Sequence, residues 1–196
     1  MNDNKLSCTD DTARQAGKPL EPAPAGGGCG PAIRDGLVDA LFVSIASQRM
    51  TAYSGNRLVS THRISTALAG PGERKDSGCT PRGKHYIRAK IGQGLPLNAV
   101  LRGRRWTGEI CTPELHAKEP QRDWILTRIL WLSGCEPGHN RLGNVDTFQR
   151  YIYIHGTPEL EQLGQPVSHG CIRMDNRELI ELFNQVAAGT LVHISA

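Results

Sequence analysis

The residues best equipped for chemistry, His155 and Cys171, lie near the C-terminal end of the chain. The alternating segment 151–155, Tyr-Ile-Tyr-Ile-His, predicts a half-buried strand that ends at the histidine, because aromatic and β-branched residues favour strands. Glycines and prolines at 156–166 interrupt regular structure, so the chain can fold back and bring Cys171 to His155. A cysteine within reach of a histidine is the minimal set for nucleophilic catalysis by a thiol.

Thiol catalysis also needs groups that orient the base and stabilise an oxyanion. A free cysteine titrates near pH ~8.5, so little of it is thiolate at neutral pH. His155 would take the proton of Cys171 or hold a thiolate–imidazolium pair, and the carbonyl of Gly156 could fix the imidazole tautomer. Gly170 permits close backbone approach, and amide groups in its turn could stabilise an oxyanion.

Three segments around these residues resemble the signature of the L,D-transpeptidase catalytic (YkuD) domain. They are His-Gly-Thr at 155–157, a loop that ends Leu-Gly-Gln-Pro at 163–166, and Ser-His-Gly-Cys-Ile-Arg-Met at 168–174. Weaker similarity at 80–87 and 127–134 extends the resemblance over about residues 41–194. The resemblance implies a mainly β, β-sandwich-like catalytic fold with one or two helices.

The resemblance also implies a reaction. Cys171 would attack the carbonyl of the L-centre residue, usually meso-diaminopimelate, in a peptidoglycan stem tetrapeptide, and His155 would protonate the departing D-amino acid. The thioester would pass to an amine, which gives a 3→3 cross-link, lipoprotein attachment or D-amino-acid exchange. Water as acceptor would give an L,D-carboxypeptidase. No metal or organic cofactor is needed, and carbapenem-type β-lactams are the expected covalent inhibitors.

Other residues of the motif have two readings each. His169 could line the oxyanion region or brace the turn, and Ser168 could contact substrate or hold the turn by a local hydrogen bond. Arg173 could be a surface cation, or, as its match to the family motif suggests, it could bind a substrate carboxylate or order the site. Tyr153, on the strand face of His155, could line the pocket or pack in the core.

Several alternative functions are compatible with parts of the same sequence. A zinc site formed by His155, His169 and Cys171 has an unusual spacing and no clear water-activating carboxylate beside it. A secreted antibacterial effector could use the same fold. A non-enzymatic wall-binding module could also keep the fold, although the intact pair of His155 and Cys171 argues against it. Without catalysis, Cys171 would be a buried structural thiol.

Composition indicates an ordinary globular chain. It has 196 residues, 38% hydrophobic and 21% charged, with a net charge of +4 that mildly favours anionic partners. Basic residues such as Arg102, Arg104 and Arg105 fit a solvated face, and no nucleic-acid motif accompanies them. No run reaches the roughly 18 apolar residues of a membrane span. The 6 cysteines do not imply a disulfide framework in a chain of this length.

The N-terminal segment differs from the rest. Residues 1–35 are rich in proline and glycine and poor in large apolar groups, which predicts a disordered tail before a catalytic domain at 36–196. Cys8 and Cys29 in the tail are interpreted as incidental thiols. No apolar signal-peptide region is visible. The family implies the periplasm or cell envelope, so the export route stays open and the cytoplasm stays an alternative.

Periodicity predicts strands that are joined by short turns and pair antiparallel with their neighbours. The predicted strands cover residues 41–45, 49–53, 57–59, 63–67, 86–91, 99–102, 105–108, 125–132 and 191–194. One helix is predicted to begin at an Asp175 cap, with Glu178 completing a capping box, and to end at Gly189.

Overall fold

The computed structural model describes residues 38–196, so the predicted tail, its two cysteines and its boundary with the catalytic domain lie outside the described residues. The strands are β1 (Val38–Ser44), β2 (Arg49–Ser54), β3 (Arg57–Ser65), β4 (Gly83–Ile91), β5 (Ala99–Arg102), β6 (Arg105–Ile110), β7 (Ile125–Gly134), β8 (Tyr153–Gly156), β9 (Ile172–Met174) and β10 (Val186–Ser195). The helices are α1 (Pro113–Lys118) and α2 (Asn176–Gln185), with 3-10 turns at Gly143–Val145 and Leu160–Gln162. The predicted mainly β fold with helices is confirmed.

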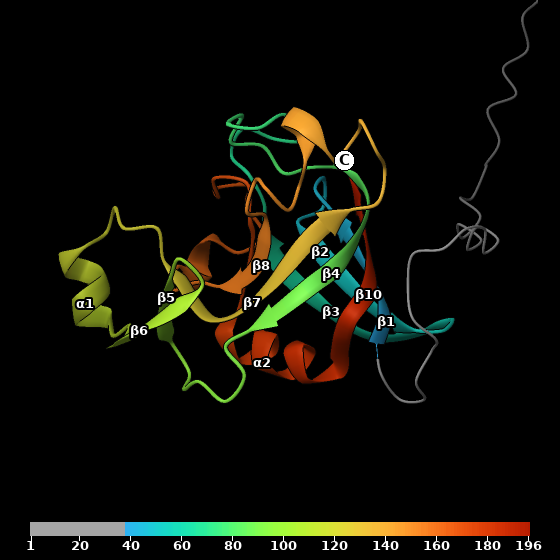
Figure 1. The fold of residues 1–196 in the computed structure, drawn as a ribbon. Coiled ribbons are helices and arrows are strands. Elements are labelled where there is room, and N and C mark those ends of the chain that lie inside the picture. The colour runs from blue at the N-terminus through green and yellow to red at the C-terminus, as the bar shows by residue number, and fades with distance from the viewer. Residues whose placement is uncertain (1–37) are drawn as a thin grey trace, which may run out of the picture.

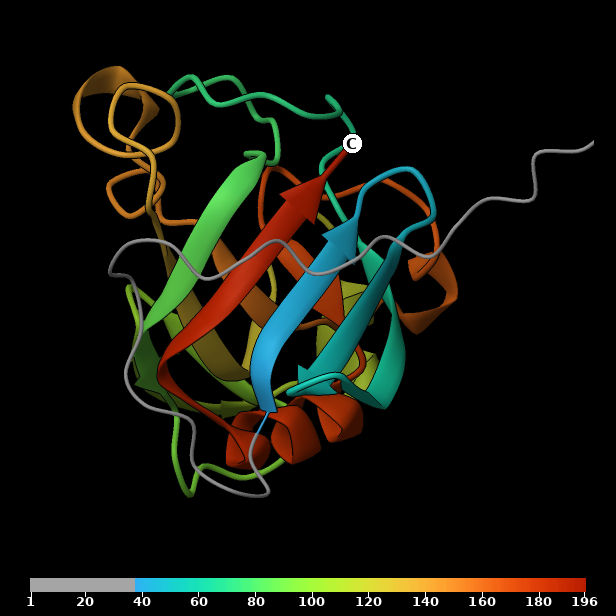
Figure 2. The ribbon, with the colours of Figure 1, turned by 90° about the vertical axis from the view of Figure 1, so that its right-hand side faces the viewer.

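The strands form one 10-stranded sheet that closes on itself. Their order is β4-β10-β1-β2-β3-β9-β8-β7-β5-β6, and β4 also pairs with β7. The strands from β4 to β7 in this order therefore make a barrel-like wall, and β5 and β6 extend from it (Figure 1). Figure 2 shows β10, β1 and β2 side by side on one wall.

Strand pairing follows the expected pattern only in part. The β1–β2 and β2–β3 pairs are antiparallel, as predicted from their closeness in sequence, and the predicted strand at 63–67 is the end of β3. By contrast, β1 pairs with β10 and β8 pairs with β9 in parallel. These two parallel pairs join distant or looped segments, so sequence proximity gave no indication of them.

The main core fills the barrel, and α2 covers one end of it. Leu179, Leu182 and Phe183 of α2 are buried together with Ile154 and Ile172 of β8 and β9. Figures 1 and 2 both place α2 across the lower end. The amphipathic face that the sequence predicted for this helix thus packs against the strands that carry the candidate site.

The start of α2 is as predicted, whereas its end is not. The side chain of Asp175 accepts hydrogen bonds from the amides of Arg177 and Glu178. The carboxylate of Glu178 does not complete a capping box, because it contacts His62 at 2.7 Å. The predicted stop at Gly189 is wrong: the helix ends at Gln185, and Gly189, with φ 95°, lies in a register irregularity of β10.

An arm formed by β5, β6 and α1 projects beside the barrel (Figure 1). It has a small core of its own, made of Val100, Cys111, Trp124 and Leu126, with Leu115 packed against it. β5 joins the arm to the barrel by pairing Leu101 with Ile125 of β7. The sequence did not predict α1, which begins at a Thr112 cap.

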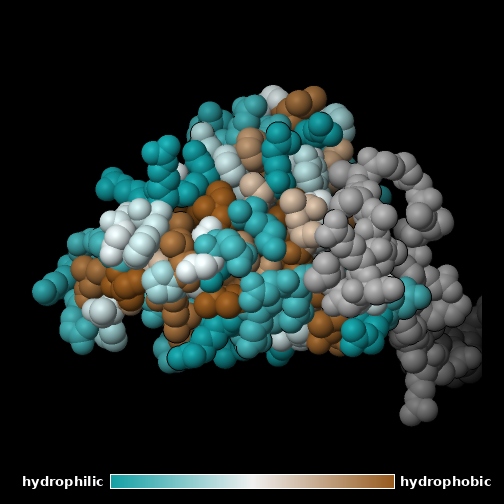
Figure 3. Space-filling model, turned by 60° about the horizontal axis from the view of Figure 1, so that its bottom comes forward, coloured by the Kyte–Doolittle hydropathy of each residue, from teal (hydrophilic) through white to brown (hydrophobic). Residues whose placement is uncertain are grey.

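The face drawn in Figure 3 carries hydrophobic and hydrophilic side chains interspersed with one another. Within residues 38–196, no helix has both the length and the apolar character of a membrane span.

Candidate active site

The parallel pairing of β8 with β9 brings the candidate residues to one side of the sheet. His155 is in register with Arg173, and Ile154 with Ile172. Both isoleucines are buried in the main core. Because side chains alternate along a strand, His155 and Arg173 face the other side, and Cys171, two positions before Arg173, precedes β9 on that same side.

The imidazole of His155 is held in one tautomer by its own strand. Its Nδ1 lies 2.8 Å from the carbonyl oxygen of Gly156, and the residue is 1% exposed. A carbonyl only accepts hydrogen bonds, so Nδ1 carries the hydrogen and Nε2 carries the lone pair. Burial lowers the pKa of His155 from its usual value, and the bond to Gly156 opposes this only in part. The imidazole is therefore a neutral base at neutral pH.

Gly156 is a glycine because Asn176 occupies the space of a side chain there. A Cβ on Gly156 would lie 2.0 Å from Asn176 Oδ1. This asparagine, the first residue of α2, accepts a hydrogen bond of 2.6 Å from the hydroxyl of Thr127 and donates one of 2.7 Å to the carbonyl of Thr157. The hydrogen bonds of Asn176 thus link α2 to β7 and to the residue that follows β8, next to His155. The sequence did not predict this role.

The thiol of Cys171 is bonded to the segment just before β8. It donates to the carbonyl oxygen of Tyr151 at 3.4 Å, and its sulfur accepts from the amide of Tyr153 at 3.3 Å. Burial raises the pKa of the Cys171 thiol to about 12. With the pKa of His155 lowered, the structure favours a neutral thiol and a neutral imidazole over the thiolate–imidazolium pair that was one of two expectations.

Local hydrogen bonds shape the turn that carries Cys171. The hydroxyl of Ser168 donates to the carbonyl of Cys171 at 2.6 Å and accepts the amide of Gly170 at 3.2 Å. Ser168 is 2% exposed, so the structure places it in the turn rather than in the cavity. The amide of Gly170 is thereby occupied. Within residues 38–196, the amides of Cys171 and His169 have no hydrogen-bond acceptor.

The backbone conformation at Gly170 favours glycine. Its φ is 131°, and a Cβ there would lie 3.3 Å from the carbonyl oxygen of Cys79. The hydroxyl of Thr80 donates to the carbonyl of Gly170 at 3.0 Å. The long loop before β4 therefore packs directly against the cysteine turn.

The position of Arg173 does not agree with the expectation that it binds a substrate carboxylate. Its guanidinium is 2.5 Å from Glu159 and 3.8 Å from Asp123, and the residue is 7% exposed. It does not line the cavity of Cys171. The geometry favours the other reading, that Arg173 orders the site by holding the loop after β8.

Cys171 opens into a cavity of about 360 Å³. The residues that line it include Arg150, Tyr153 and His169. The side chain of His169 is exposed and makes no hydrogen bond within residues 38–196. Tyr153 satisfies both of its expected roles, because it lines the cavity while it is buried against Leu101 and Ile129.

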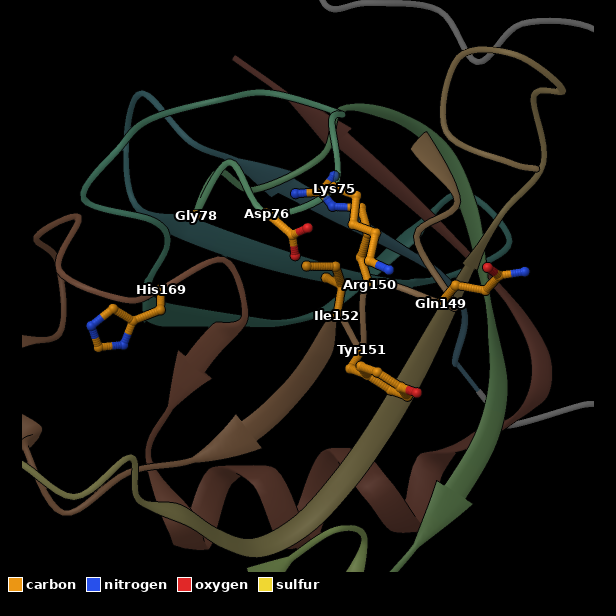
Figure 4. A pocket seen from close by; sticks show the side chains of 8 residues that line it. All are labelled: Lys75, Asp76, Gly78, Gln149, Arg150, Tyr151, Ile152 and His169. Atoms are coloured by element: carbon orange, nitrogen blue, oxygen red, sulfur yellow. The ribbon is translucent and has the colours of Figure 1, made fainter. Parts of the chain in front are cut away.

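A second cavity of about 230 Å³ adjoins the first. The two share Arg150, Tyr151 and His169, and Figure 4 shows His169 on a separate loop with its imidazole directed away from Arg150. The guanidinium of Arg150 donates to the carbonyls of Gly72 and Cys79 at 3.1 and 2.6 Å. Arg150 was not predicted, because no local pattern marks a residue whose partners lie in a distant loop.

No group of three or more His, Cys, Asp or Glu residues in the described part of the chain is arranged to hold a metal ion. The zinc hypothesis for His155, His169 and Cys171 therefore has no geometric support.

Comparison with known proteins adds three findings. The family model of the L,D-transpeptidase catalytic domain, YkuD, matches residues 39–194. YqjB of Bacillus subtilis and YkuD of Bacillus licheniformis, both provisionally named L,D-transpeptidases, are each 50% identical to this chain, over 46 and 47 residues. Each match covers 24% of this chain and only 26% and 28% of the respective relative.

A solved structure shows the same fold. L,D-transpeptidase 3 of Mycobacterium tuberculosis, in complex with a faropenem-derived adduct, aligns with a TM-score of 0.51 and 17% identity. The alignment covers 82% of this chain and 61% of that one.

Proposed function

Because the chain belongs to the L,D-transpeptidase catalytic domain family, we propose that it is a cysteine acyltransferase that acts on peptidoglycan stem tetrapeptides. The observation that carries this proposal is the placement of Cys171 and His155 on one side of the paired strands β8 and β9, with the imidazole oriented by Gly156. A thiol, an oriented neutral base and free amides in one turn are the parts that acyl transfer requires.

In the first half-reaction, Cys171 attacks the carbonyl carbon of the L-centre residue. Nε2 of His155 takes the thiol proton as the S–C bond forms, and the hydrogen bond from Nδ1 to Gly156 stabilises the resulting imidazolium. The amides of Cys171 and His169 supply the donors for the oxyanion, in place of the amide of Gly170, which Ser168 occupies. The C–N bond then breaks, His155 returns the proton to the departing D-amino acid, and a thioester remains on Cys171.

In the second half-reaction, an amine attacks the thioester. His155 takes a proton from the attacking nitrogen, and the thiolate of Cys171 leaves as the new amide forms. The imidazolium then returns its proton to the thiolate. The thiol is regenerated, and no metal or organic cofactor enters either half.

The same nucleophile would react with β-lactams of the carbapenem type. Opening of the strained ring by Cys171 would leave an acyl group on sulfur, and the relative from Mycobacterium tuberculosis carries a faropenem-derived adduct. We assign the catalytic domain to residues 36–196 and place the protein in the cell envelope, where stem peptides occur.

The test is product analysis by mass spectrometry after incubation with a defined stem tetrapeptide, with and without an amine acceptor. Transpeptidation predicts release of the terminal D-residue and a cross-linked product that depends on the amine. Release without a cross-linked product would identify an L,D-carboxypeptidase. An unchanged tetrapeptide would overturn the proposal.

A further inference from the structure

Arg104 stands in a backbone conformation that its side chain does not favour. It is the second residue of the two-residue turn between β5 and β6, where Arg102 pairs with Arg105. Gly103 and Arg104 have φ values of 56° and 66°. A turn with two positive φ values is normally built from glycine, asparagine or aspartate. Arginine at this position indicates that its side chain, rather than its backbone, is required.

The guanidinium of Arg104 reaches back from the arm to the barrel and lies against aromatic rings. Its central carbon is 4.7 Å from the ring centre of Trp131 and 5.1 Å from that of Tyr151. Its Nη1 donates to the hydroxyl of Tyr153 at 3.3 Å. These partners fix the position of the charged group without neutralising it.

Several other arginines of the described chain differ in this respect. Arg88 is likewise held by an aromatic ring and a tyrosine hydroxyl, but it does not line the cavity of Cys171. Arg82, Arg122 and Arg173 each bind a carboxylate, at 2.8, 2.7 and 2.5 Å. The guanidinium of Arg150 donates hydrogen bonds to three backbone carbonyls. Arg104 has no carboxylate partner within residues 38–196, and its one hydrogen bond to a side chain uses a single donor of the five that a guanidinium carries.

Tyr153 connects this free cation to the nucleophile. Its amide donates to the sulfur of Cys171 at 3.3 Å, and its hydroxyl accepts from Arg104. Arg104 and Cys171 line the same cavity of about 360 Å³. The guanidinium therefore lies about one tyrosine side chain away from the attacking sulfur, within the space that a substrate would fill.

We propose that Arg104 is a specificity-determining residue that binds a carboxylate of the acyl donor while Cys171 attacks the scissile carbonyl. This proposal rests on the proposed function. The planar fork of donors matches a carboxylate, and the aromatic rings hold it ready. Arg104 takes the role that the sequence motif suggested for Arg173, whose fork is occupied by Glu159. The stem tetrapeptide offers up to three such groups: its terminal carboxylate, the carboxylate at the end of its third side chain, and the α-carboxylate of its γ-linked second residue.

The test measures donor affinity in a Cys171→Ala background, so that binding is read without turnover. Arg104→Gly removes the guanidinium and gives the turn the residue that its φ prefers, so thermal stability should be kept or raised. Affinity for the tetrapeptide should fall by about tenfold or more, because a charged bidentate contact is lost. Arg104→Lys should bind with intermediate affinity. Arg105→Gln, an exposed neighbour in the same hairpin, is the matched control and should bind as the parent does.

Donors that are each amidated at a single carboxylate then identify the group that is bound. Amidation of the recognised carboxylate should weaken binding to the parent and abolish the difference between the parent and Arg104→Gly. Amidation at either of the other positions should leave that difference intact. Equal affinities of Arg104→Gly and the parent for the fully charged donor would overturn the proposal.

This design separates the inference from the proposed function. If the intact protein shows no turnover while the Arg104-dependent difference in binding persists, acyl transfer fails and carboxylate binding stands. If turnover is normal but the variants bind alike, acyl transfer stands and the role of Arg104 is wrong.

Discussion

The thiol of Cys171 donates to the carbonyl oxygen of Tyr151, at a distance of 3.4 Å. In the resting protein the nucleophile is thus bonded to the backbone, and burial keeps it protonated. On the proposed mechanism, the thiol hydrogen turns from Tyr151 to Nε2 of His155 only when substrate is attacked. Reactivity would then be coupled to the presence of substrate.

Alkylation of Cys171 should therefore show the pH dependence of a partly buried, neutral thiol. Because burial raises the pKa of Cys171 to about 12, the thiolate fraction should rise about tenfold per pH unit across the neutral range. The rate with iodoacetamide should climb from about pH 6.5 to about pH 9 without a plateau, and His155→Ala should change this slope little. A plateau below about pH 8 that vanishes in His155→Ala would show a resting thiolate–imidazolium pair instead.

Arg173 and Glu159 should behave as one structural pair. Glu159→Gln leaves a buried guanidinium with only the more distant carboxylate of Asp123, which should cost up to about 3 kcal/mol of unfolding free energy. Arg173→Lys keeps the charge but loses the planar fork, and should also be destabilising. In both variants, turnover of a charged donor and alkylation of Cys171 should fall together. Lower turnover with unchanged stability and alkylation would assign Arg173 to substrate binding.

Asn176 should position the base, because it packs on Gly156 and bonds to Thr157. In Asn176→Asp, a carboxylate oxygen would face the carbonyl of Thr157, which removes a donor and should cost on the order of 1–3 kcal/mol. Turnover should fall, and lowering the pH to protonate the carboxylate should restore part of it. The exposed Asn144→Asp is the control. Equal melting temperatures and turnover in the two variants would contradict this role.

Stability should fall as the pH falls through a window set by two buried histidines, His85 and His155, because burial lowers the pKa of both. Burial lowers the pKa of His85 to about 4, so the unfolded chain binds more protons than the folded one between about pH 6.5 and pH 4. Unfolding free energy should decrease as pH falls through that window, by at most about 1.4 kcal/mol per pH unit from this residue. His85→Gln should reduce the dependence measured by urea unfolding and leave the part that His155 contributes, whereas the exposed His139→Gln should not change it. An unchanged slope in His85→Gln would show that other groups cause it.

The sequence predicted the parts of the site that are local. The histidine at a strand end, its contact with Gly156, the cap at Asp175 and the turn around Cys171 all depend on neighbouring residues. The predicted strand at 151–155 was only partly right, since Tyr151 has a φ of 58° and β8 begins at Tyr153.

The parts that were missed depend on contacts between distant segments. The partner of Arg173 is Glu159 in a loop, Arg150 binds carbonyls more than 70 residues away, and Asn176 meets Thr127 across 49 residues of chain. Arg104 was interpreted as part of a solvated face, because the rings beneath it come from β7 and the segment before β8.

The central claim is that Cys171 forms the acyl-enzyme, and intact-protein mass spectrometry tests it most directly. After brief incubation with a stem tetrapeptide and no amine acceptor, the protein should gain the mass of the donor less its terminal D-residue. Peptide mapping should place the adduct on Cys171, and Cys171→Ala should show none while Cys79→Ala keeps it. A donor that is turned over by Cys171→Ala, or an adduct that maps to another residue, would contradict the account.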